Sequence, residues 1–188
     1  NVLGAQQHGH MEAVGYEMYL QMLEQAISEE RGDQTKKPKK ECLVDLPIDA
    51  HIPPTYIESV PQRLGIYRRI ADITSRADAD DVTDELIDRF GEPPAPVLGL
   101  IRTSLLRAYS AQHNIYEIGR KGDKLLLHID DLDMQEISAI AAGFPGRVTV
   151  SAAGKPHIAV RIMPQDKMLD LLEKVLMLMN TANKQKDS

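Results

Sequence analysis

Two carboxylates, Glu85 and Asp88, stand out among the residues that could do chemistry, because they lie together in the acidic stretch 81–91. At a spacing of three they are neighbours on the surface of a helix, where two like charges slightly destabilise that helix. Such a pair is typical of a solvated face, or of an acidic patch that meets Arg or Lys on another protein surface. A catalytic carboxylate site would also need a converging base, nucleophile or metal ligand, and the sequence shows none nearby.

The other residues that could take part in catalysis or metal binding are isolated or wrongly spaced. His8 and His10, with Glu12 close by, could approach one metal ion, but the spacing is not H-E-x-x-H and solvated loop histidines are the expected outcome. Cys42 falls on a predicted strand with no histidine nearby, which indicates a buried structural thiol and not a nucleophile. The chain also lacks a phosphate-binding loop, a G-x-G-x-x-G turn and a cysteine pair for zinc. We therefore predict no catalytic residue, no metal site and no cofactor within this fragment.

Four lysines in residues 36–40 form a basic run that could touch nucleic acid. No aromatic residue is interleaved with these lysines. The net charge of −6 also argues against nucleic-acid binding by the chain as a whole. A weak nucleic-acid-binding module and an independent small enzyme with a carboxylate site are the two alternatives to a protein-binding function. Salt-sensitive DNA binding by the fragment would favour the first of them.

The composition indicates a globular chain with an aliphatic core. Hydrophobic residues make up 43% and charged residues 27%, with eight Met, two Phe and no Trp. A single cysteine fits a reducing compartment, and no apolar run reaches the length of a membrane span. With no secretory signal, the predicted location is cytoplasmic. The chain begins at Asn1 inside what reads as a motif, so we expect a fragment of a longer polypeptide.

Helical periodicity dominates the first half of the chain. A long helix is predicted over residues 10–31, and the Lys-rich linker that follows it predicts a boundary between residues 1–40 and a compact domain over residues 41–188. A short strand is expected at 42–46. Three helices should follow. Ser59 caps the first, the second (the acidic helix) runs from an N-cap at Asp78 to Gly91, and Pro93-Pro94 opens the third, which runs to about His113.

Alternating periodicity takes over in the second half. Hairpins are predicted over residues 115–129 and 148–162, with a short helix between them that begins with a capping box of Asp133 and Glu136. Met134, Ile137 and Ile140 should face inward on that helix. A last helix is expected from about Gln165 to Ala182, with a frayed polar tail from Asn183. Helices first and hairpins second, after a separate N-terminal helix, predict an α+β fold.

Four stretches of the sequence, in order and at fitting spacings, match a known pattern. They are NVLGAQQHGH with EAVGY (residues 1–10 and 12–16), LPIDA with IP (46–50 and 52–53), QRL with YRRIA (62–64 and 67–71), and ELIDRFG (85–91). Together they resemble the C-terminal part of the bacterial transcription-repair coupling factor family, also called Mfd. Up to about Gly91 the resemblance rests on specific residues. Beyond Gly91 it rests only on the general pattern of the sequence.

The resemblance implies a parent that is an ATP-driven translocase on double-stranded DNA, related to helicases. Such a parent acts on RNA polymerase stalled at a lesion and recruits UvrA of nucleotide excision repair, while ATP and magnesium bind to motor domains absent from this chain. Residues 1–40 resemble the tail of the translocation motif shared with the RecG helicase. The glutamine that couples hydrolysis to movement falls on Gln7, and the usual serine after it is His8 here.

The resemblance further implies that residues 41–188 are the family's C-terminal regulatory domain. In the family this domain docks on the parent's own UvrB-like N-terminal module and hides the surface that binds UvrA. The acids of that intramolecular interface fall on Glu85 and Asp88. The leading interpretation is therefore a non-catalytic, autoinhibitory, protein-binding domain.

Overall fold

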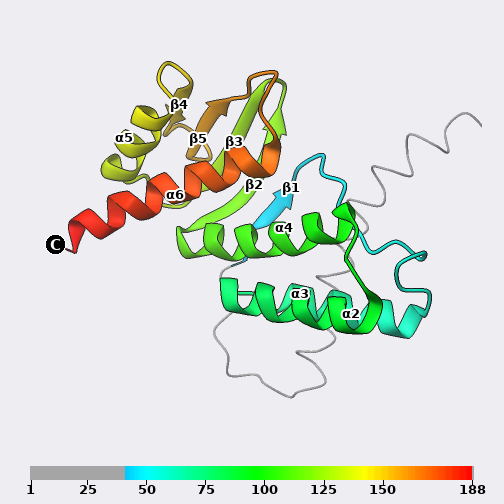
Figure 1. Ribbon diagram of the computed structural model, residues 1–188. Helices are drawn as coiled ribbons and strands as arrows, with labels where there is room; N and C mark the ends of the chain where they lie inside the picture. Colours follow the sequence, from blue (N-terminus) through cyan, green and yellow to red (C-terminus); the bar gives the residue numbers. More distant parts are fainter. Residues whose placement is uncertain (1–40, 188) are drawn as a thin grey trace, which may run out of the picture. The chain divides into compact units, whose positions relative to one another are not determined.

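The computed structural model describes residues 41–187, which form two compact units (Figure 1). The first unit contains residues 47–105, and the second contains residues 41–46 together with residues 106–187. The predicted helix over 10–31, the metal-site candidates His8 and His10, and Gln7 lie outside the described residues. The predicted boundary at residue 40 therefore stays a prediction.

Three helices build the first unit: α2 (Val60–Ala71), α3 (Arg76–Phe90) and the part of α4 (Ala95–Gln112) that ends at Leu105. Their apolar faces supply an aliphatic core, as the composition predicts. Its fully buried members include Ile57, Ile66, Ile70, Leu86, Val97 and Leu100. The backbone also packs closely, since a Cβ on Gly99 would lie 3.1 Å from the carbonyl oxygen of Asp49.

The acidic helix α3 begins three residues earlier than the sequence predicts. Ser75 is its N-cap and accepts a hydrogen bond from the Asp78 N–H, while the Asp78 carboxylate accepts from the Ser75 N–H. Asp78 is thus the second half of a capping box and not the cap itself, which corrects the prediction. Hydrogen bonds from the backbone and side chain of Thr74 hold the pKa of Asp78 below its usual range. Gly91 ends the helix with φ of +83°, a conformation that favours glycine.

A five-stranded mixed sheet forms the centre of the second unit, in the order β1-β2-β3-β5-β4. Its strands are β1 (Leu43–Asp45), β2 (Ile115–Lys121), β3 (Lys124–Ile129), β4 (Val148–Ser151) and β5 (His157–Arg161). Both predicted hairpins are confirmed as antiparallel pairs, β2 with β3 and β4 with β5. Strand β1 pairs in parallel with β2, a contact between residues distant in the sequence.

Helices α5 (Met134–Gly143) and α6 (Met168–Lys186) pack against each other beside this sheet (Figure 1). Helix α6 buries one long apolar stripe, consisting of Leu171, Leu172, Val175, Leu176, Met179 and Ala182. The predicted α+β fold is confirmed. No helix among residues 41–187 is long and apolar enough to cross a membrane.

Two local predictions in the second unit are wrong. Met134 is 71% exposed, and Glu136 turns inward in its place on the buried face of α5 with Ile140. The tail beyond Ala182 is not frayed, because α6 continues to Lys186 and its last turn contacts the start of α5. There the Lys186 ammonium donates to the carboxylate of Asp133, the N-cap of α5.

The contact between Lys186 and Asp133 predicts a pH effect at the acid end of the scale. The Lys186 hydrogen bond, followed by the N–H of Glu136, holds the pKa of Asp133 below its usual range. Stabilisation by this group is therefore complete above the ordinary aspartate pKa of about 3.9 and is lost as the pH falls through the lower folded-state pKa. In urea unfolding curves we expect Asp133→Asn, which keeps a good N-cap, to be less stable than wild type at pH 7. The difference should shrink below about pH 4.

Asp131→Asn is the matched control, since this exposed neighbour carries the same charge without the contact to Lys186. A wild-type advantage over Asp133→Asn that stays constant down to pH 2, or an equal effect of Asp131→Asn, would contradict the assignment.

Candidate protein-binding surface

The exposed face of α3 carries a row of acids. Asp81, Asp84 and Asp88 recur at helical spacing and are all exposed, while Val82 and Leu86 on the other side are buried. Asp88 has no ion pair or hydrogen bond among the described residues. This carboxylate is therefore placed as the sequence predicts, in solvent and free to meet a cation.

Glu85 differs from this prediction, because its carboxylate is already paired. Its Oε2 lies 2.5 Å from Nη1 of Arg69 on α2, and its Oε1 accepts a hydrogen bond of 3.2 Å from Nη1 of Arg89. The Glu85 side chain is only 27% exposed, against 49% and 44% for the two arginines. Glu85 thus faces the helix pair α2 and α3 and is shielded from solvent by two cations.

The end of α3 is fixed by an aromatic contact. The Tyr56 hydroxyl donates to the carbonyl of Gly91 at 2.7 Å and to that of Leu86 at 3.3 Å. Its ring meets the Phe90 ring edge-on at 6.0 Å, and the Arg89 guanidinium lies over Phe90 at 4.9 Å. Burial, and then the charge of Glu92, raises the pKa of Tyr56, so its proton is retained at neutral pH. These contacts hold Arg89 and the end of α3 in place.

The surroundings of Glu85 and of the single cysteine can be described residue by residue. Within residues 41–187, no group of three or more His, Cys, Asp or Glu residues could hold a metal ion. Cys42 is buried at 3% exposure, as predicted for a structural thiol. Glu85 has two arginines at its oxygens, with no nucleophile between it and Asp88. On α3, Glu85 is therefore paired with two arginines, while Asp88 lies exposed beside it.

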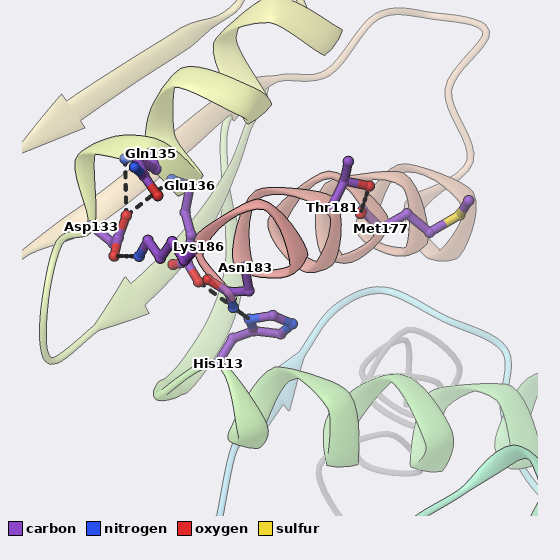
Figure 2. Close-up of polar contacts among 8 residues, drawn as sticks. All are labelled: His113, Asp133, Gln135, Glu136, Met177, Thr181, Asn183 and Lys186. Carbon is purple, nitrogen blue, oxygen red and sulfur yellow. Dashed lines mark hydrogen bonds and ion pairs between the residues drawn. The ribbon is translucent and has the colours of Figure 1, made fainter. Parts of the chain in front are cut away.

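Sequence reasoning missed a polar cluster in the second unit, shown in Figure 2. Nδ1 of His113 lies 3.4 Å from Oε1 of Glu136 and 3.5 Å from Nδ2 of Asn183 on α6. The side chains of His113 and Glu136 are only 8% and 9% exposed. A protonated Nδ1 can donate to the carboxylate, and a bare Nδ1 can accept from the amide, so the imidazole has a partner in either form. The nearby Lys186–Asp133 contact lies on the same side of α6 (Figure 2).

The chain has an α+β fold, and its helix α3 presents an exposed face of mixed charge. The model of the family described as "TRCF domain" matches residues 46–140, a span that includes both Glu85 and Asp88. The chain belongs to this TRCF domain family.

The sequence relatives of the chain carry the name of the transcription-repair coupling factor. The transcription-repair-coupling factor of Bacillus subtilis (strain 168) is 32% identical over 160 residues, which cover 82% of this chain and 14% of that protein. The factor of the same name from Staphylococcus aureus (strain USA300) is 36% identical over 132 residues, covering 69% of this chain and 11% of that protein. The chain thus spans about a seventh of the length of these relatives or less.

A solved structure has the same fold. The crystal structure of the C-terminal domain of transcription-repair coupling factor superposes with a TM-score of 0.67 at 23% identity. The match covers 80% of this chain and 98% of that one. This likeness covers a larger share of the chain than the residues 46–140 that the family model matches.

Proposed function

We propose that this chain is the C-terminal regulatory region of a longer transcription-repair coupling factor and acts there as an autoinhibitory, non-catalytic domain. Its docking partner is the parent's own UvrB-like module in the cytoplasm, and docking masks the surface that binds UvrA. The parent's translocation on double-stranded DNA, its ATP and magnesium sites and its contact with RNA polymerase belong to other domains. Gln7 would couple hydrolysis to movement in that context.

The observation that carries the proposal is the free acidic row on α3 within the family-matched span. Asp88 is exposed and unpaired among the described residues, and it follows Asp81 and Asp84 along one face. An exposed carboxylate adds little to the stability of its own helix, so its value lies in meeting a cation across an interface. Masking UvrA binding most of the time requires a docking preference of only a few kcal/mol.

The first test is calorimetric titration of this chain with the parent's UvrB-like module at low and moderate salt. We expect binding that weakens as salt rises, because the contacts are ionic. The double variant Glu85→Ala with Asp88→Ala should weaken binding by about tenfold or more, since two charge-assisted contacts are lost at about 1 kcal/mol each.

Asp130→Ala with Asp131→Ala is the matched control, because it removes the same charge from exposed positions of the second unit, outside the acidic row. An equal loss of binding affinity in both double variants would show that the loss comes from the change in net charge and not from specific contacts of Glu85 and Asp88. In the full-length parent, the Glu85/Asp88 variant should bind UvrA more tightly than wild type. Unchanged UvrA binding would remove these two residues from the interface. Fusing the two pieces would detect a contact that needs the tether's effective concentration.

A further inference from the structure

We infer that Arg69 is an internal competitor for Glu85 and so sets the strength of docking through the α3 face; this inference rests on the function proposed above. The starting observation is that Arg69 and Glu85 come from different helices, α2 and α3, yet their charged atoms are 2.5 Å apart. The carboxylate oxygen that Arg69 holds, Oε2, is the one that Arg89 leaves free.

The charges around Glu85 decide the direction of the effect. Arg69 and Arg89 bring two positive charges to the two negative charges of Glu85 and Asp88. This part of the surface is therefore electrically balanced, and an incoming cation is attracted chiefly by the acids Asp81 and Asp84 farther along the helix. Without Arg69, the same part of the surface carries a net negative charge and one free carboxylate oxygen.

The two arginines are not equivalent. Arg89 is on the same helix as Glu85, and its guanidinium also lies over the Phe90 ring, which Tyr56 supports. Arg69 has Glu85 as its only ion-pair partner among the described residues, and its side chain is 49% exposed. Arg69 can therefore swing into solvent at small cost, because an exposed ion pair contributes little. The partner's cation replaces Arg69, while Arg89 stays.

The consequence is a two-part interface. Asp88 is available from the first encounter, while Glu85 joins only after its oxygen has exchanged one cation for another. Exchange of ion pairs gives less net free energy than formation of a new one, because the first pair must be broken. The domain therefore docks less tightly than two free acids would allow, and release by other parts of the parent remains possible.

The test is a docking titration of Arg69→Gln, with Arg68→Gln as the matched control. Arg68 is the exposed neighbour on α2, so its replacement removes the same charge without freeing Glu85. We expect Arg69→Gln to bind the UvrB-like module about two- to fivefold more tightly than wild type, the range that an exposed ion pair allows. Arg68→Gln should change binding less. In a Glu85→Gln background the gain from Arg69→Gln should vanish.

Three outcomes would overturn the inference, and they can be told apart. If Arg69→Gln and Arg68→Gln tightened binding to the UvrB-like module equally, the effect would come only from the change in net charge and not from competition for Glu85. Weaker binding by Arg69→Gln would make Arg69 a positioning residue for Glu85 and not its competitor. Absence of binding by wild type and by all variants, including the fused pieces, would remove the proposed function and this inference with it. In the first two cases the docking function itself stands.

Discussion

Replacing His113 with Ala is expected to lower the free energy of unfolding by about 3 kcal/mol, although the residue belongs to the second unit and not to the candidate interface. The change leaves the buried Glu136 carboxyl without the imidazole that lies 3.4 Å from it, and a buried polar group left without a partner costs about 1–3 kcal/mol. It also removes the contact of His113 with Asn183 of α6. Urea unfolding followed by circular dichroism measures the change, since the chain has no Trp.

His51→Ala is the control for His113→Ala. His51 is paired with Asp49 at 3.0 Å, but its side chain is 35% exposed and that of Asp49 is 78% exposed, so we expect a change of about 0.5 kcal/mol or less. A double variant, His113→Leu with Glu136→Leu, should recover part of the loss, because apolar side chains need no partner. Equal effects of His51→Ala and His113→Ala would contradict a buried pair.

Leu86→Ala should have the largest effect in the first unit, with a loss of about 2–5 kcal/mol. Leu86 is fully buried on the side of α3 opposite the acidic row, so truncation removes apolar contacts and leaves a cavity. Hydrogen exchange read by mass spectrometry assigns the loss, since amides of α2 and α3 should exchange faster while those of the sheet change less.

Leu98→Ala is the matched control, being the same substitution in a helix at a side chain that is 45% exposed. We expect it to change stability by about 0.5 kcal/mol or less. Comparable losses from Leu86→Ala and Leu98→Ala would show that Leu86 is not a core residue. Docking experiments on the acidic row remain interpretable only while Leu86 holds α3 in place.

The sequence predicts the helices and strands of the described region because their signals are local. Ser59 and Asp133 do cap α2 and α5, and both hairpins follow from short alternating runs around turns. The start of α3 was misplaced because Ser75 and Asp78 form one reciprocal box, and either residue alone resembles a cap. The strand order and the parallel pairing of β1 depend on contacts across long sequence separations, which no local pattern encodes.

The charged pairs were missed for the same reason. The local pattern assigns Glu136 to a capping box with Asp133 and Met134 to the core, whereas the histidine that makes burial of Glu136 possible comes from the turn just after α4. Likewise Glu85 looks solvated until α2 brings Arg69 to it. In both cases a side chain's surroundings depend on a partner in another element, and single-sequence periodicity contains no information about that partner.

The parallel pairing of Leu43–Asp45 with Glu117–Gly119 has a consequence for synthesis of the chain. Residues 46–119 must all leave the ribosome before β1 can complete its pairing with β2. At about 5–20 residues per second, the strand waits several seconds with its edge unpaired. The helices of residues 47–105, which lie between β1 and β2 in the sequence, have that time to fold as a unit. Their folding shortens the flexible loop that must close before β1 pairs with β2. The order of emergence thus favours folding of the helices first and completion of the sheet last.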